Sequence, residues 1–252
     1  MTQTLTPQTP PTIRWEILPE NFVLPDDPVE NILQPFLAAA VTEALDLAGL
    51  IRPTMLVASN MGICTNVNGK TVVKAPDWFY VPRATPPAEG AVRRSYTPYT
   101  EGDVPQIVME FLSETDAGEY SIRPVFPYGK LWFYERILQV PIYIIFDPGT
   151  GLLEVRQLEG DRYQLLSPDE TGRYFIPSLN LFLGSWFGKR QEQTAHWLRW
   201  WDPDGNLLLW GSERIAREQE RAERERQRAD AAERELPRLR ERLRDAGLPD
   251  DE

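Results

Sequence analysis

Two carboxylates and one lysine stand out because they lie at defined places in otherwise apolar segments. Asp77 opens the apolar run Trp78–Val81. Glu110 lies inside the apolar run Ile107–Leu112, and Lys130 lies near the start of a stretch with helical spacing. A carboxylate in a buried strand carries a large desolvation cost unless a cation or hydrogen-bond donors compensate it. If the two acids and the lysine meet at one end of a sheet, they supply the parts of a magnesium-dependent phosphodiesterase site.

The chemistry of such a site follows from the types of these three side chains. Hard carboxylate oxygens suit Mg²⁺, which binds through a few carboxylates and keeps several of its waters. The ion lowers the pKa of a bound water, and a lysine can orient that water or neutralise the charge that builds on the phosphate oxygens. A plainer interpretation stays open, because an aspartate after a proline is common in turns. An inward glutamate can also pair with Lys130 as a simple buried ion pair.

The segments around these residues have recognisable secondary-structure patterns. Apolar residues recur at helical spacing in Asn31–Ala48 and again over residues 128–140, where a proline then ends the pattern. Asn68-Gly69 lies between two β-prone runs and predicts a tight hairpin. The runs 107–112 and 142–146 are short and almost wholly apolar, which is typical of strands covered on both faces.

Downstream of these segments the sequence predicts a further antiparallel β region. We expect one ribbon built from Leu152–Leu158, Tyr163–Leu166, Phe175–Pro177 and Leu181–Leu183. Trp197–Trp201 and Asn206–Trp210 flank a turn of the type Asp-Pro-Asp-Gly, and we expect them to form a tryptophan-rich hairpin that packs on the domain.

The last forty residues change to arginine, glutamate and alanine. Several apolar residues fall at heptad spacing, namely Ile215, Ala222, Ala229, Leu236 and Leu243. The companion seam position holds Glu218 and Glu225 before it turns apolar, and Pro237 interrupts its second half. We expect one long helix that either pairs with its copy in a homodimer or stands alone in solvent.

The composition limits the classes of function that the chain can serve. A formal charge of -11 is unlike that of a strong DNA binder, which neutralises phosphates with clustered lysine and arginine. One cysteine and one histidine exclude an internal disulfide and argue against a structural zinc site. No apolar stretch approaches the length of a membrane span and no signal-peptide pattern opens the sequence, so we expect a cytoplasmic protein with no membrane partner.

The order of these motifs resembles the PD-(D/E)xK nuclease superfamily and, more narrowly, its Uma-type restriction endonuclease family. The matching residues are Pro76-Asp77, Glu110-Phe111-Leu112-Ser113, Gly129-Lys130-Leu131 with Tyr134, and Val140-Pro141-Ile142-Tyr143 with Asp147-Pro148. The resemblance covers about residues 30–150, and the β region and charged helix beyond it are similar to an extension found in some members.

The resemblance implies an α/β, restriction-endonuclease-like fold with a mixed central sheet flanked by helices. It also implies that Asp77 and Glu110, with the Phe111 carbonyl, hold a divalent ion, Mg²⁺ or Mn²⁺. Lys130 would then be a displaced motif lysine, because the position two residues after Glu110 is a leucine. Two further residues are carried over as supporting members, Glu43 as the acid of the first helix and Tyr134 as a partner of Lys130 one turn later.

These expectations combine into one interpretation of the whole chain. Residues 1–28 would be a flexible, proline-rich lead-in, residues 29–211 a nuclease-like domain with a β extension, and residues 212–252 an arginine- and glutamate-rich helix. The expected function is Mg²⁺-dependent hydrolysis of DNA phosphodiester bonds. The alternative, favoured by the acidic charge, is a catalytically inactive protein that keeps the fold and assembles through its C-terminal helix.

Overall fold

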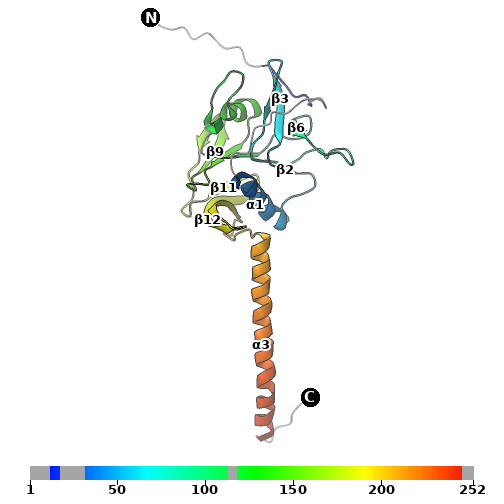
Figure 1. The fold of residues 1–252 in the computed structure, drawn as a ribbon, viewed down its shortest axis with the longest axis vertical. Coiled ribbons are helices and arrows are strands. Elements are labelled where there is room, and N and C mark those ends of the chain that lie inside the picture. The colour runs from blue at the N-terminus through cyan, green and yellow to red at the C-terminus, as the bar shows by residue number, and fades with distance from the viewer. Residues whose placement is uncertain (1–11, 18–31, 113–117, 246–252) are drawn as a thin grey trace. The chain divides into compact units, whose positions relative to one another are not determined.

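A computed structural model of the chain describes residues 12–17, 32–112 and 118–245 (Figure 1). The chain divides into two compact units, Met1–Leu208 and Leu209–Glu252. In the part of the chain that the structure describes, no helix is long and apolar enough to cross a membrane.

A six-stranded mixed sheet forms the centre of the first unit. Its spatial order is β10-β9-β8-β7-β5-β2, and only the central pair β7–β8 is parallel. In chain order the strands are β2 (Leu56–Ala58), β5 (Trp78–Val81), β7 (Ile107–Phe111), β8 (Ile142–Phe146), β9 (Leu153–Glu159) and β10 (Arg162–Leu165). Every residue of β7 and β8 is buried, which confirms the prediction of strands covered on both faces.

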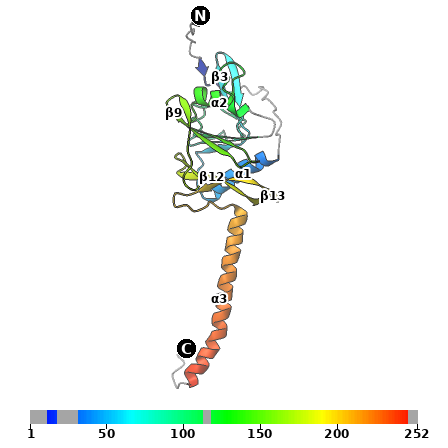
Figure 2. The same cartoon turned by 90° about the vertical axis from the view of Figure 1, so that its left-hand side faces the viewer.

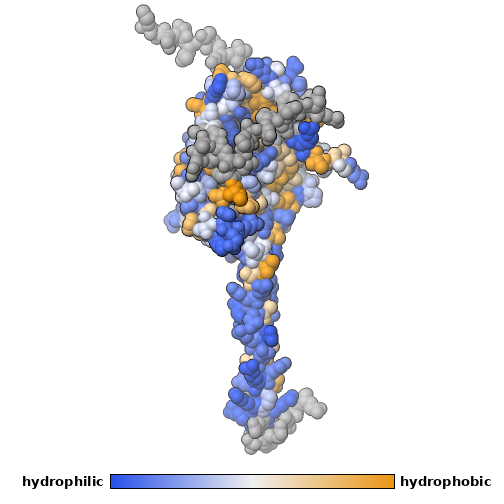
Figure 3. All heavy atoms as spheres, in the orientation of Figure 1, coloured by the Kyte–Doolittle hydropathy of each residue, from blue (hydrophilic) through white to orange (hydrophobic). Residues whose placement is uncertain are grey.

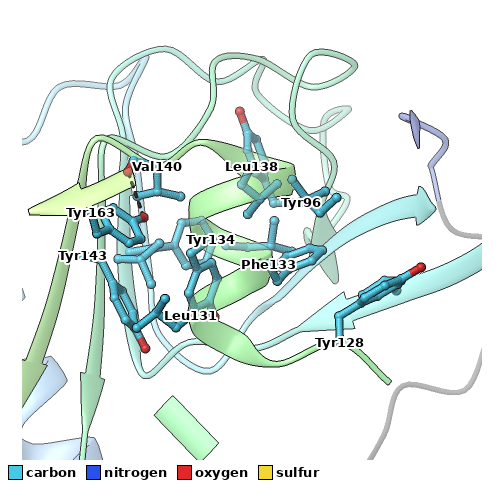
Figure 4. Packing of buried hydrophobic residues seen from close by; sticks show 14 of the residues in the cluster. Tyr96, Tyr128, Leu131, Phe133, Tyr134, Leu138, Val140, Tyr143 and Tyr163 are labelled. Carbon is cyan, nitrogen blue, oxygen red and sulfur yellow. Dashed lines mark hydrogen bonds between the residues drawn. The ribbon is translucent and has the colours of Figure 1, made fainter. Parts of the chain in front are cut away.

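A short helical crossover joins the two parallel strands. It begins as α2 (Lys130–Trp132) and continues as the π-helical segment η2 (Phe133–Leu138). Figure 4 shows its apolar side chains in contact with the sheet, where buried aromatic residues from the crossover meet Tyr143 of β8. Parallel strands need a crossover of this kind because a tight turn cannot join them.

A second, smaller sheet contains the predicted hairpin. Its strands are β1 (Ile13–Arg14), β3 (Gly62–Val67), β4 (Lys70–Lys74) and β6 (Ser95–Tyr96). Asn68 and Gly69 both have positive φ, at 53° and 79°, so the Asn-Gly prediction is confirmed. Strand β1 falls within the predicted lead-in, most of which lies outside the described residues.

The predicted single ribbon is wrong, because its strands belong to two different sheets. β9 and β10 complete the central sheet, whereas β11 (Tyr174–Ile176), β12 (Leu181–Arg190) and β13 (Gln193–Trp201) form a separate antiparallel sheet. The main partner of β13 is β12. The segment that follows β13 pairs with it through a bridge between Trp201 and Leu207 and a backbone hydrogen bond from the Leu208 N–H to the Trp200 carbonyl.

Helix α1 (Leu33–Leu47) lies between the central sheet and the β11–β13 sheet (Figure 2). Two indole N–H groups reach it from opposite sides. Trp78 of β5 donates to the Thr42 hydroxyl at 2.9 Å, and Trp200 of β13 donates to the Val41 carbonyl at 3.2 Å. The first unit is therefore an α/β fold of the restriction-endonuclease type, with helices on both faces of its central sheet and an added three-stranded antiparallel sheet.

The second unit is dominated by one helix, α3 (Gly211–Asp245), which runs through Pro237 without a break. This confirms the prediction of one long helix. Its surface is mostly hydrophilic with scattered apolar residues, as Figure 3 shows, and Ile215 and Leu236 are 61% and 51% exposed. Charged pairs one turn apart, such as Arg221 with Glu225, stabilise a solvent-facing helix of this kind.

Candidate functional site

The two predicted acids lie opposite each other on one face of the central sheet. β5 and β7 are antiparallel, and Trp78 pairs with Met109, so the next pair in register is Asp77 with Glu110. Directly paired residues of antiparallel strands project on the same side. The backbone N–H of Phe111 donates to Asp77 Oδ2 at 2.6 Å, which holds the aspartate against the end of β7.

Glu110 is fully buried, and two side chains of the crossover hold its carboxylate. The Tyr134 hydroxyl donates to Oε1 at 2.9 Å, and Lys130 Nζ donates to Oε2 at 3.2 Å. Lys130 and Tyr134 are four residues apart, so both can face the same strand from one side of a helix. The structure thus brings together four of the residues that the sequence singled out, Asp77, Glu110, Lys130 and Tyr134.

A third carboxylate, which the sequence did not single out, completes this group. Glu119 lies in the single turn η1 (Gly118–Tyr120), and its Oε1 accepts a hydrogen bond from Lys130 Nζ at 3.1 Å. The Tyr143 hydroxyl donates to the Glu119 backbone carbonyl at 2.9 Å and fixes this turn over β8. In the sequence, Glu119 is one of several acids in a polar connector, and no pattern ranks it above Glu114 or Asp116.

The approach of this turn to the crossover depends on a glycine. A Cβ atom at Gly129 would lie 2.1 Å from the backbone oxygen of Ser121, which is far closer than atoms can approach. Only glycine therefore allows the segment that carries Glu119 to pack directly against the start of α2. In the Gly-Lys pair of the sequence, Gly129 is thus needed for close packing and Lys130 supplies the charge.

Burial, and to a lesser extent repulsion by neighbouring carboxylates, raises the pKa values of both strand acids. Desolvation raises the pKa of Asp77 to about 6, although the Phe111 N–H and Lys130 oppose this change. Desolvation, and then the charges of Asp77 and Glu119, raise the pKa of Glu110 to about 8 against the opposing effect of Lys130. Burial would lower the pKa of Lys130, but Glu110 and Glu119 outweigh it and raise that pKa above its usual value.

The group is therefore short of positive charge. Three carboxylates gather near a single ammonium, which forms ion pairs with Glu110 and Glu119, and the two strand acids hold protons more tightly than free carboxylates do. A divalent cation would supply the missing charge. Among the described residues, however, no group of three or more His, Cys, Asp or Glu side chains could hold a metal ion as they lie. The expected set has two carboxylates, Asp77 and Glu110, and a backbone carbonyl, all of them oxygen donors of the kind that Mg²⁺ takes.

The carbonyl and helix residues of the expected site have other contacts. The Phe111 carbonyl accepts a hydrogen bond from the Gln34 side chain at 2.9 Å. Glu43, expected as the acid of the first helix, forms an ion pair with Arg190 at the end of β12. Gln34 is thus an α1 side chain that contacts the end of β7, and a neutral amide gave no signal in the sequence.

Comparison with protein families places this geometry in context. Residues 3–187 match the model of the family Uma2, whose description is "Putative restriction endonuclease". The matched region includes all the residues of the group described above, and it agrees with the resemblance drawn from the sequence motifs. The comparison with curated proteins gave no match.

Proposed function

The chain belongs to the Uma2 family, and from that premise we propose that it is an endonuclease that hydrolyses DNA phosphodiester bonds with Mg²⁺ or Mn²⁺. The observation that carries the proposal is a fully buried glutamate in the middle of the central sheet, Glu110, which shares one face with Asp77. A protein that needed only a stable core would have an apolar residue at this position, because a buried carboxylate is costly.

Each residue of the group has a role in this proposal. Asp77, Glu110 and the Phe111 carbonyl would hold the divalent ion, which when bound would lower the pKa of a water and stabilise charge on the phosphate. Tyr134 fixes the rotamer of Glu110 through its hydroxyl. The Lys130 ammonium, already at this strand end, can donate a hydrogen bond to a phosphate oxygen.

The net charge of -11 favours the alternative of an inactive protein with a nuclease fold. So does the leucine at position 112, where the usual motif has its lysine. The two functions differ in a property that can be measured without DNA. An active site of this type binds a divalent ion through Asp77 and Glu110, whereas a structural ion pair between Glu110 and Lys130 has no need of one.

Calorimetric titration with Mg²⁺ or Mn²⁺ tests the proposal. The wild-type protein is expected to bind one ion and to nick supercoiled DNA only when that ion is present. Asp77→Ala removes one of the two carboxylates, so both binding and nicking should be lost while the melting curve still shows a folded protein. Asp204→Ala, at an exposed turn position, is the matched control and should change neither. Nicking by Asp77→Ala at the wild-type rate would contradict the proposal.

We further propose that α3 pairs with its copy in a homodimer through the heptad seam. Ile215 and Leu236 expose apolar surface along this helix. Removal of residues 212–252 should leave the first unit folded, because that unit ends before the helix. Light scattering is expected to show about half the mass after truncation, beyond the small loss from the deleted residues. A full-length protein that already has the mass of a single chain would refute the pairing.

A further inference from the structure

The Lys130 ammonium is shared by two carboxylates that come from different elements. Its Nζ lies 3.2 Å from Glu110 Oε2 on β7 and 3.1 Å from Glu119 Oε1 on η1. Among the described residues these are the two carboxylates that form ion pairs with Lys130. One partner is an expected metal ligand, and the other is not.

The two partners would respond differently to a bound cation. If Glu110 binds a divalent ion, the ion takes up the negative charge that attracts the ammonium. The ion and the ammonium also repel each other, because like charges a few ångströms apart in a buried site interact strongly. Glu110 alone would then no longer hold Lys130 in place, and Glu119 would be the remaining counter-charge.

Burial and backbone contacts hold Glu119 in a fixed position. Its side chain is only 7% exposed, its backbone carbonyl is held by Tyr143, and Ser121, directly after its turn, packs against Gly129. Its second oxygen, Oε2, is buried and has no hydrogen-bond partner within the described part of the chain. The three acids do not form a common metal-binding group. The contact of the Glu119 carboxylate that bears on the site is therefore its ion pair with the Lys130 ammonium.

We propose that Glu119 is a positioning residue that keeps the Lys130 ammonium at the site while Asp77 and Glu110 hold the cation. This inference rests on the proposed function, because it requires that the two strand acids bind a divalent ion. It assigns Glu119 a role only in the loaded state, since without the ion Glu110 can hold the lysine by itself.

Amine acylation followed by mass spectrometry can test this role directly. The chain has four lysines, Lys70, Lys74, Lys130 and Lys189, so the label on Lys130 is easily resolved and the other three serve as internal references. In the wild-type protein, Lys130 should be protected with and without Mg²⁺. In Glu119→Gln it should be protected without Mg²⁺ but acylated at least about fivefold faster with Mg²⁺, as expected for an ammonium released by charge repulsion.

Cleavage and binding measurements on the same variant complete the test. Glu119→Gln should lower kcat for DNA cleavage about 10- to 100-fold, which is less than the about 100- to 1,000-fold loss on removing a transition-state donor itself, because the lysine is still present. KM should change little, and the calorimetric affinity for Mg²⁺ should stay within about threefold because both strand acids remain. Glu135→Gln, which removes another buried carboxylate of the crossover, is the matched control and should alter neither kcat nor Lys130 labelling.

The possible results separate this inference from the proposed function. If the wild-type protein binds no divalent ion, the proposed function fails and the inference falls with it. If the ion binds but Glu119→Gln keeps Lys130 protected and cleaves normally, only the inference is overturned. Labelling of Lys130 in Glu119→Gln at the same rate with and without Mg²⁺ would also overturn it, since Glu119 would then be an ordinary structural partner. If Glu119→Gln does not fold, the shorter Glu119→Asp is put through the same comparison.

Discussion

Glu110→Gln is expected to lower the rate of Mg²⁺-dependent DNA cleavage by about a thousandfold, which corresponds to about 4 kcal/mol of lost transition-state stabilisation. The substitution keeps the size of the side chain and its hydrogen bond with Tyr134, but it removes the negative charge that a cation requires. The measurement is the initial rate of plasmid nicking at saturating Mg²⁺, with the melting curve recorded to show that the variant is folded.

A matched variant separates loss of chemistry from loss of structure. Glu135 is also a buried glutamate of the crossover, but it binds the Tyr163 N–H and the guanidinium groups of Arg136 and Arg162 instead of the site. Glu135→Gln should therefore destabilise the protein and leave the cleavage rate per folded molecule unchanged. If both variants cleave DNA equally well, Glu110 is a structural residue and the observed activity comes from elsewhere.

The same Glu110→Gln substitution is expected to remove a pH dependence of stability from the ion-free protein. In the folded state the pKa of Glu110 is about 8, compared with an ordinary value of 4.5. Between these values the folded protein keeps a proton that the unfolded chain has released, so raising the pH favours unfolding. The contribution of Glu110 to the free energy of unfolding should thus be greatest below pH 4.5. It should decrease by about 3 to 5 kcal/mol in total as the pH rises through 8.

Urea denaturation at pH 5, 7 and 9 checks this prediction. The wild-type curve should fall more steeply with pH than the curve of Glu110→Gln, and the variant should be the more stable protein at pH 9. Asp77, whose pKa is raised to about 6, adds a smaller effect of the same sign at lower pH that remains in both proteins. Saturating Mg²⁺ should flatten the wild-type curve, because it binds the ionised carboxylates of the folded state. If the free energy of unfolding depends on pH in the same way in both proteins, burial does not destabilise the ionised form of Glu110.

The sequence predicted the strand acids and Lys130 because each is a rare charge among apolar residues. A buried strand has a simple signature, and a single glutamate inside it is conspicuous. The Asn-Gly turn was equally clear, since few residue pairs accept positive φ at both positions. These features depend on local sequence, and local sequence was sufficient.

Other parts of the site depend on contacts that local sequence does not encode. Glu119 and Gln34 lie in polar or mixed surroundings, and only the tertiary fold brings them to Lys130 and Phe111. Glu43 was named because the resemblance implies an acid on the first helix, but it forms an ion pair with Arg190, whereas Gln34 on the same helix contacts Phe111. The sequence predicted the β strands after residue 150, but not their division between two sheets. That division depends on which distant strands pair, and local periodicity does not encode strand partners.

The position of α1 between two sheets has a practical consequence for anyone who trims this protein. The family match ends at residue 187, in the middle of β12, so a fragment cut there would lose β13 and the indole of Trp200. The buried side of α1 that faces β13 would then meet water, and exposed apolar surface of that kind promotes aggregation. Gln34, which contacts the end of β7, lies on the same helix. The end of the family match at residue 187 is therefore a poor guide to the C-terminal limit of the smallest functional fragment.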